Sequence, residues 1–524
     1  MVIPRSVPHR DPGSRQVRKP ADHGWPAREH TEAPNFTPNA PATRVPRTRL
    51  TPPTSAPTAV RGVTVDDPVP IPDLHHQGIF GAKTRVGSGS ARVSGVTEEP
   101  EHSSRRLKVA QFTDNYGPGS NGLMFAVQQL EGNLLDAGHE VVVVAPKAKG
   151  PNPHLGREGR VELRLPSVRV PNMPTRVANG RHFERTIEQV GELDPDVIHV
   201  HGLGTVGVLG TWAAKRLNKP MLMTWHTDFD AYADHYAAVL PLLHGVVRAF
   251  ARLTHGEILN SNDLRDAAVR FADRGRSTAT LLGLCKKMLD SADLVTSPSP
   301  KTAARCLSLA PEANLVVVPN GVDPLPSGPP PVPRGPGPLV IYVGRIAPEK
   351  GLPLLCEAFE LVVAQCPDAQ LMVVGDWQRY PKIAKVLDAG RRRGHIILPG
   401  EQKRESLGAF YEMGDLYAFP SQTDTQALVL HEAALAGLPI VSVDPELQLV
   451  LEPGVNAELA SPTPASLAAA IMRIIEKLPD PQWRAHASET SRRLAGQWTV
   501  ESQAQEMLRI YQRMAQRRPL PQAG

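Results

Sequence analysis

The 524-residue sequence contains few aromatic residues, few cysteines and no long apolar run. Aromatic residues make up 5% of the chain, and none of its four cysteines forms a C-x-x-C pair. Neither a zinc site nor a disulfide framework is therefore predicted. Every apolar run is shorter than a membrane span, and no apolar stretch follows the N-terminal arginines as it would in a signal peptide. These features favour a protein of the reducing cytoplasm.

Residues 1–105 are rich in proline and show no pattern that could build a core, so we predict a disordered basic tail. The first 106 residues hold 15 Lys and Arg against 10 Asp and Glu, whereas the rest holds 43 of each sign, so the pI near 9.0 comes from the tail. We interpret the tail as a solvated extension, or as the product of a start codon assigned too far upstream. Contact with anionic lipid or nucleic acid is the alternative for the tail. We expect no nucleic-acid partner for the protein.

Apolar strands alternate with amphipathic helices after the tail, which predicts parallel sheets covered on both faces. The first helix begins at the N-cap Asn121 and ends at Gly138. The first series of predicted strands spans residues 108–113, 141–144, 196–201, 221–225, 294–297 and 315–318. The second series spans residues 340–343, 371–374, 396–398, 416–419 and 440–443.

Proline and glycine are dense in Pro324–Pro338, which we interpret as a linker between two domains. The predicted fold class is α/β, with two Rossmann-like, doubly wound domains that face each other across a cleft. We expect the domains to span residues 106–323 and 339–497. A C-terminal helix within residues 498–518 would return to the N-terminal domain.

The segment Gly344–Gly351 carries the strongest chemical signal. It follows a predicted strand and precedes a helix, and it contains Arg345 and Lys350. Glycine lets a ligand approach the backbone closely, and two cations at a helix N-terminus favour an anion such as a diphosphate. A solvated basic turn is the alternative for this segment alone.

Two carboxylates follow a later strand. Asp424 lies in the segment Pro420–Ala427, and Glu432 lies eight residues further on, in the next helix. The pair could bind hydroxyl groups at two ends of one ligand, and the alternative is a helix cap plus a solvated glutamate. Because Glu432 is surrounded by apolar residues in the sequence, we expect it to need a buried polar partner.

These motifs, together with Pro319–Asp323, resemble glycosyltransferase family 4 from Leu107 to about Gln516. The resemblance implies the GT-B fold, with an acceptor-binding N-terminal domain and a donor-binding C-terminal domain. It also implies a retaining enzyme that needs no metal ion, because Arg and Lys neutralise the diphosphate.

The resemblance assigns roles to the residues that match the motifs of the second domain. Arg345 and Lys350, after Gly344, would bind the donor diphosphate and act in catalysis. Glu432 would bind the ribose hydroxyls. Asp424 would bind hydroxyls of the transferred sugar, at a position where the family usually has Glu.

Further residues carry over in the same way. The segment Gln426, Ala427 and Leu428 would complete the phosphate site, although the family has glycine where this chain has Ala427. Gly122 would let the first loop approach the donor. His226 would be catalytic, beside the reacting carbon, where a neutral imidazole suits the developing positive charge.

Within the family, Thr113–Tyr116 and Trp225–Asp228 resemble the lipid-modifying members, namely diacylglycerol glucosyltransferases and phosphatidylinositol mannosyltransferases. Asn121 is then a candidate acceptor residue. Arg248 and Arg252 belong to a basic stripe on a predicted amphipathic helix, which is typical of contact with an anionic membrane. An ordinary half-buried helix is the alternative.

Two motifs point to other chemistry. The segment Gly202–Gly207 reads G-x-G-x-x-G, but it comes late in its domain, so we do not interpret it as a dinucleotide site. The segment Asp228–Asp230 matches a metal-binding D-x-D of another transferase fold, and we interpret Asp228 as a helix-start residue.

The sequence therefore predicts a glycosyltransferase that moves a hexose, glucose or mannose, from a nucleoside diphosphate sugar to a hydroxyl acceptor. The resemblance favours a glycerolipid or phosphatidylinositol as acceptor, and peripheral association with the inner face of the membrane. The alternatives are a catalytically silent GT-B binding protein, which Ala427 would favour, and a sugar-nucleotide epimerase of the same fold.

Overall fold

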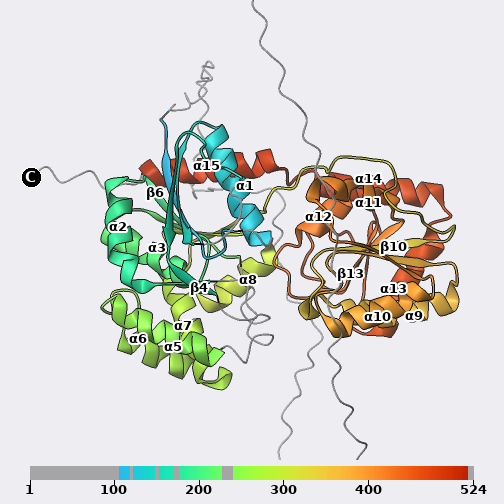
Figure 1. Ribbon diagram of the computed structural model, residues 1–524, viewed down its shortest axis with the longest axis horizontal. Coiled ribbons are helices and arrows are strands. Elements are labelled where there is room, and N and C mark those ends of the chain that lie inside the picture. Colours follow the sequence, from blue (N-terminus) through green and yellow to red (C-terminus); the bar gives the residue numbers. More distant parts are fainter. Residues whose placement is uncertain (1–104, 118–121, 148–152, 170–175, 227–239, 517–524) are drawn as a thin grey trace, which may run out of the picture. The chain divides into compact units, whose positions relative to one another are not determined.

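The structure is a computed structural model that describes residues 105–117, 122–147, 153–169, 176–226 and 240–516 (Figure 1). The side chains of residues 240–243 are not described. The predictions for residues 1–104, for Asn121 and for Asp228–Asp230 lie outside the described residues.

The first sheet has seven parallel strands in the order β3-β2-β1-β6-β7-β8-β9. Six of them confirm the predicted strands to within two residues at each end, and β3 was missed because charged residues interrupt its apolar pattern. The strands are β1 (Lys108–Phe112), β2 (Glu140–Pro146), β3 (Arg160–Leu165), β6 (Val197–Val200), β7 (Met221–Thr224), β8 (Leu294–Ser297) and β9 (Leu315–Val317). An antiparallel pair, β4 (Ser167–Arg169) and β5 (Arg176–Ala178), lies outside this sheet.

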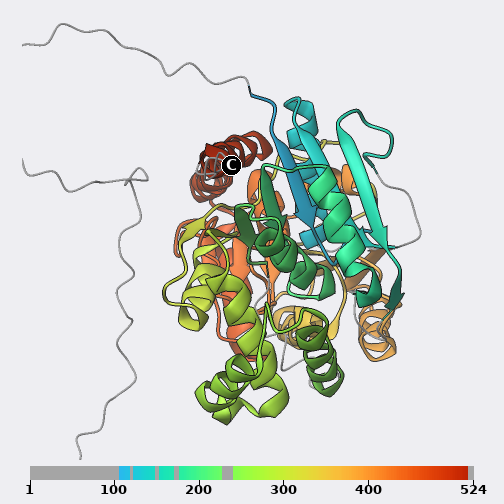
Figure 2. The same ribbon diagram turned by 90° about the vertical axis from the view of Figure 1, so that its left-hand side faces the viewer.

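Helices cover both faces of the first sheet, and α5, α6 and α7 pack together (Figures 1 and 2). The first helix ends before Gly138, which has a φ of +78° that glycine adopts without strain. The helices are α1 (Gly122–Asp136), η1 (Gly180–His182), α2 (Phe183–Glu192), α3 (Thr205–Arg216), α5 (Leu240–Leu253), α6 (Ser261–Arg270), η3 (Ala272–Arg274), α7 (Arg276–Asp290) and α8 (Pro300–Leu309). None of the helices in the described ranges combines the length and hydrophobicity needed to span a bilayer.

The second sheet has six parallel strands in the order β12-β11-β10-β13-β14-β15. The five predicted strands are present, and the three-residue β15 at the edge was missed. The strands are β10 (Leu339–Val343), β11 (Gln370–Val374), β12 (Ile396–Gly400), β13 (Leu416–Phe419), β14 (Ile440–Ser442) and β15 (Ala457–Leu459). The fold class is thus α/β with two doubly wound sheets.

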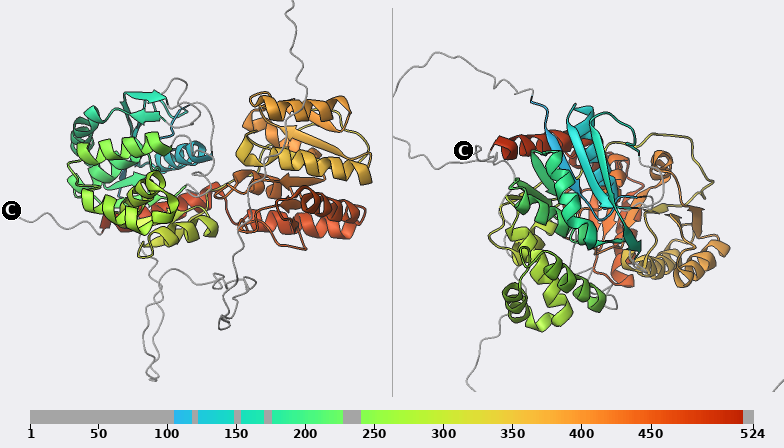
Figure 3. Two further views of the ribbon diagram at one scale, coloured as in Figure 1. Left: turned by 90° about the horizontal axis from the view of Figure 1, so that it is seen from below. Right: turned by 60° about the vertical axis from the view of Figure 1, so that its left-hand side comes forward.

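Two layers of helices enclose the second sheet (Figures 1 and 3). Leu355, Leu387 and Ile471 share one core cluster, and Phe410 and Leu430 share the cluster on the other face. The helices are η4 (Pro348–Lys350), α9 (Leu352–Gln365), α10 (Pro381–Arg392), η5 (Arg404–Ser406), α11 (Leu407–Met413), α12 (Leu428–Leu435), α13 (Pro464–Lys477) and α14 (Pro481–Ala495).

Two segments connect the sheets. Residues 324–338 contain no helix or strand. The last helix, α15 (Val500–Gln516), packs against α1 and β6 of the first sheet. Met507 and Tyr511 share a core cluster with Val127, and the Tyr511 hydroxyl lies 2.7 Å from Nδ1 of the buried His199. The chain therefore returns to its first sheet after completing the second.

Candidate functional site

The loop after β10 places two cations at the carboxyl end of the second sheet. Gly344 follows the strand, and η4 brings Lys350 next to Gly351. Gly351 has a φ of +71°, and a Cβ there would lie 2.1 Å from the carbonyl oxygen of Pro420. Only glycine lets this loop pack so closely on the loop that follows β13.

Both cations of this loop are paired with carboxylates. Lys350 Nζ lies 2.5 Å from Asp424 Oδ1, and Arg345 lies 2.5 Å from Glu349 Oε1. The Ser421 hydroxyl donates to the other Asp424 oxygen at 2.5 Å. Burial alone would raise the pKa of Asp424, but Lys350 and Ser421 lower it below its usual range. Asp424 is therefore ionised at neutral pH and joins the two predicted donor-site loops.

Glu432 is buried in α12, with a side chain only 2% exposed. Arg404 of η5 donates to one carboxylate oxygen, and the Tyr411 hydroxyl donates to the other at 2.9 Å. The Arg404 guanidinium also lies 4.3 Å from the centre of the Phe125 ring on α1. The sequence predicts that Glu432 needs a polar partner but cannot identify Arg404 and Tyr411, because both precede it by 20 or more residues in separate elements.

Ala427 occupies a backbone conformation that favours glycine. It stands directly before α12 with a φ of +59° and is 8% exposed. A left-handed conformation costs a residue with a Cβ about 1–2 kcal/mol, which gives a physical reason for the glycine expected at this position. The first residue of α12 is Leu428, and a Cβ added to Gly122 would lie 3.9 Å from its Cδ1. The structure thus brings Gly122 of α1 beside the start of α12.

The Gln426 side chain binds protein groups. Its carbonyl oxygen accepts from the backbone and side-chain amides of Asn320, each at 2.8 Å, and its amide donates to the Asn320 carbonyl at 2.9 Å. Gln426 therefore joins the loop after β13 to the predicted motif Pro319–Asp323.

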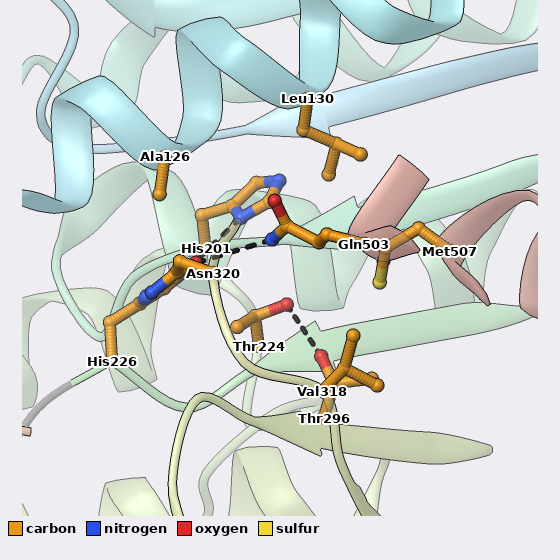
Figure 4. A pocket seen from close by; sticks show the side chains of 10 residues that line it. All are labelled: Ala126, Leu130, His201, Thr224, His226, Thr296, Val318, Asn320, Gln503 and Met507. Atoms are coloured by element: carbon orange, nitrogen blue, oxygen red, sulfur yellow. Dashed lines mark hydrogen bonds between the residues drawn. The ribbon is translucent and has the colours of Figure 1, made fainter. Parts of the chain in front are cut away.

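His226 follows β7 and lines a small pocket with His201, Asn320 and Gln503 (Figure 4). Its Nε2 lies 3.5 Å from His201 Nδ1, and burial lowers the pKa of His226 to about 4. His226 is therefore neutral at physiological pH, as its predicted role requires. Thr227 and Asp228 lie outside the described residues.

Two further histidines continue from His226 toward the protein interior, and the sequence did not predict either of them as a site residue. The rings of His199 and His201 lie 3.7 Å apart, and His199 Nε2 lies 2.7 Å from the Thr224 hydroxyl. Burial lowers the pKa of both imidazoles well below the usual value. The alternation His-Val-His in a buried strand could have indicated that both rings face one side of the sheet.

The G-x-G-x-x-G segment encloses a carboxylate of the protein itself. The amides of Gly204, Val206 and Gly207 donate to Asp114 at 3.0, 2.8 and 3.2 Å. A Cβ at Gly204 would lie 2.6 Å from the Asp114 carboxyl carbon. Asp114 thus occupies the position that a dinucleotide would need for its diphosphate, which argues against a dinucleotide site in this loop.

The acceptor-side predictions are described only in part. Arg248 and Arg252 are exposed on α5, while Val247 and Phe250 of the same helix are buried. The amphipathic pattern of this helix is therefore present. Asn121 lies outside the described residues.

Comparison with known proteins places this geometry among glycosyltransferases. Residues 121–324 match the family model described as Glycosyltransferase Family 4, and residues 337–477 match the one described as Glycosyl transferases group 1. The structure is similar to sucrose-phosphate synthase of Thermosynechococcus elongatus, with a TM-score of 0.56 at 20% identity, over 78% of this chain and 99% of that one. It is also similar to HepE of Anabaena in complex with UDP and glucose, with a TM-score of 0.54 at 17% identity, over 78% and 100%.

Three curated relatives align with this chain over most of their own lengths. The α-monoglucosyldiacylglycerol synthase of Acholeplasma laidlawii is 24% identical over 67% of this chain and 84% of its own. The phosphatidyl-myo-inositol mannosyltransferase of Mycolicibacterium smegmatis is 26% identical over 75% and 90%. The GDP-mannose-dependent α-mannosyltransferase of the same organism is 25% identical over 64% and 80%.

Two doubly wound sheets, with a cationic loop at the carboxyl end of the second, define the GT-B fold that these solved structures share. The chain therefore carries a Glycosyltransferase Family 4 domain at residues 121–324 and a Glycosyl transferases group 1 domain at residues 337–477, and it is a hexosyltransferase.

Proposed function

We propose that the protein transfers glucose or mannose from a UDP- or GDP-sugar to a hydroxyl group of a glycerolipid or of phosphatidylinositol, with retention of configuration. The observation that carries the donor half is the Lys350–Asp424 contact, which joins a cation for the diphosphate to a carboxylate for the sugar. The names of the relatives, which include a glycolipid synthase and a phosphatidylinositol mannosyltransferase, support the acceptor half.

Donor binding would exchange partners within the site. Arg345 and Lys350 would turn from Glu349 and Asp424 to the diphosphate oxygens, and Asp424 would then accept hydrogen bonds from the sugar hydroxyls. Both cations would stabilise the charge that develops on the leaving diphosphate. No divalent metal ion is needed in this scheme.

The ribose would bind at Glu432. Its oxygens already accept from Arg404 and Tyr411, and each carboxylate oxygen has a second lone pair for a hydroxyl donor. On the acceptor side, the leaving diphosphate would take the acceptor proton on the same face of the sugar, which gives retention. The neutral His226 would lie beside the reacting carbon without repelling its positive charge.

The acceptor would be reached at an anionic membrane surface. Arg248 and Arg252 present two exposed cations on α5, next to its buried apolar residues. Such a helix can lie in the lipid headgroup region, where each basic residue contributes about 1 kcal/mol.

The test combines binding and product analysis. Thermal shift with UDP, GDP, UDP-glucose and GDP-mannose should select one nucleotide. Transfer is then assayed with diacylglycerol or phosphatidylinositol in anionic vesicles, followed by determination of the anomeric configuration. A glycolipid with the anomeric configuration of the donor is expected. Nucleotide binding without any transfer or hydrolysis would favour the silent binding protein, and an altered free sugar nucleotide would favour the epimerase.

A further inference from the structure

The start of α8 contacts the loop that carries Asp424. The Ser299 hydroxyl caps α8 by accepting from the Thr302 amide at 3.2 Å, and it donates to the carbonyl oxygen of Thr425. The Thr302 hydroxyl donates to the same carbonyl at 3.1 Å. A helix that follows β8 of the first sheet therefore holds the backbone of the loop that follows β13 of the second sheet.

Lys301 adds a buried charge to these contacts. Its side chain is 2% exposed, and its Nζ lies 2.8 Å from the Gln422 carbonyl oxygen and 2.7 Å from Asp444 Oδ2. The Asp444 side chain is 4% exposed, and its other oxygen accepts from the Glu446 amide at 3.0 Å. The charge of Lys301 is thus compensated in a buried position.

Stability alone is a weak reason for such a pair. Removing two charges from water costs several kcal/mol, and well-packed apolar residues of similar volume often stabilise a protein as much or more. A buried ammonium does, however, fix the positions of the groups that it contacts. Here these groups are the side chain after β14 and the backbone two residues before Asp424.

The contacts lie on both sides of the donor-site carboxylate. Gln422 is held by Lys301 and Thr425 by Ser299 and Thr302, so the residues between them have little freedom to shift. We propose that Lys301 is a positioning residue of the donor site, which holds the segment Gln422–Thr425 so that Asp424 meets the transferred sugar. This inference rests on the proposed function, since it assumes that Asp424 contacts the donor.

Lys301→Met keeps most of the length of the side chain, one atom shorter, and removes its charge. Because small misplacements of a catalytic group can lower rates by up to about 10²-fold, we expect kcat for transfer to fall at least about tenfold, with the donor KM within about threefold. Amide hydrogen exchange in the peptide covering residues 420–428 should accelerate at least about tenfold, as local opening becomes easier. Lys301→Arg, which keeps the charge and the donors, should restore part of both.

Arg305→Ala is the matched control. Arg305 lies one turn further along α8 and pairs with Glu446 at 2.8 Å, but the two side chains are 44% and 43% exposed. Like the Lys301–Asp444 pair, this pair joins α8 to the segment after β14, but it does not involve the segment Gln422–Thr425. We expect its kcat and its exchange to stay within about twofold of wild type, because exposed pairs contribute little.

The double variant Lys301→Met with Asp444→Leu separates positioning from stability. The melting temperature should recover, because no unpaired charge is left buried, whereas kcat should stay low. Recovery of kcat together with the melting temperature would overturn the proposal. If the wild type transfers no sugar from any donor tested, the proposed function fails, and hydrogen exchange in residues 420–428 still decides whether Lys301 holds the loop. Unchanged exchange in Lys301→Met would refute it.

Discussion

The two glycine-rich loops of this protein, Gly202–Gly207 and Gly344–Gly351, both follow a strand and precede a helix, yet their amides and side chains serve different purposes. The first loop surrounds the Asp114 carboxylate with three backbone amides. The second carries Arg345 and Lys350, which pair with the carboxylates of Glu349 and Asp424 and which in the proposed function would turn to the donor diphosphate. Glycine spacing thus indicates close backbone approach, and the charge at the loop determines what approaches it.

The same contrast extends along the carboxyl ends of the two sheets. The first sheet presents neutral imidazoles at His199, His201 and His226, whose pKa values burial lowers. The second presents the ionised Asp424 and its cations. In the proposed function this contrast divides the chemistry, since the charged groups would bind the diphosphate and a neutral group would lie beside the reacting carbon.

The largest expected effect is at the cationic loop. Lys350→Ala and Arg345→Ala should each lower the transfer rate by about 10²–10³, because each removes a cation from the developing phosphate charge. Steady-state kinetics on folded protein measures this. Arg391→Ala, which removes an exposed arginine paired with Asp388 on α10, is the control and should leave the rate unchanged. Near-normal rates in both loop variants would remove the diphosphate assignment.

His226→Ala should lower the rate by about 10² and change donor affinity only a few-fold, the pattern of an interaction made mainly in the transition state. Circular dichroism confirms that the variant is folded.

The pH dependence of the wild-type transfer rate gives a second test of His226. With a pKa of about 4, the His226 imidazole stays neutral between about pH 6 and 9. Its contribution should be lost only as the pH falls through about 4. A folded variant within about threefold of wild type would make His226 structural.

Asp114→Ala tests the loop Gly202–Gly207, whose amides bind the Asp114 carboxylate. It leaves three backbone amides, of which those of Val206 and Gly207 are buried, without their acceptor, so the free energy of unfolding should fall by about 2 kcal/mol, as measured by urea denaturation. Asp114→Asn keeps one acceptor oxygen and should lose less. In folded Asp114→Ala, affinity for UDP and GDP should stay at the wild-type value. Lost nucleotide affinity at unchanged stability would instead make this loop a nucleotide site.

Ala427→Gly should slightly stabilise the protein. Relief of the left-handed conformation contributes about 1–2 kcal/mol, and the greater freedom of glycine in the unfolded chain offsets about 0.5–1 kcal/mol, which leaves a net gain of roughly 0.5 kcal/mol. Ala434→Gly, inside α12, is the control and should destabilise by about 1 kcal/mol. A loss of stability in Ala427→Gly would show that the Ala427 methyl group contributes more by packing than it costs by strain.

The smallest expected effect concerns metal ions. Since Arg345 and Lys350 supply the positive charge, EDTA should leave UDP and GDP affinity unchanged in isothermal titration. Loss of binding in EDTA with recovery in magnesium would return attention to Asp228–Asp230.

The sequence predicted most of the two sheets and the residues of the donor loops, because these signals are local. A buried parallel strand is a continuous apolar run, and a loop that contacts a ligand needs glycine at fixed positions. Hence β8 and β13 match the prediction residue for residue. The edge strands β3 and β15 were missed because charged residues interrupt their apolar patterns, alternately along β3 and at Glu458 in the centre of β15.

Only the tertiary structure decided which groups meet. Asp114 lies about 90 positions from the amides that bind it, Glu432 lies 28 from Arg404, and Lys301 lies 121 from Gln422. No periodicity links such residues, since their contacts depend on the order of strands in each sheet and on the return of α15 to the first. The sequence thus determined the fold class, the family and the charged loops. The partners of each charge followed from tertiary packing, because a buried charge without a partner is costly and its partner comes from whichever element the fold brings next to it.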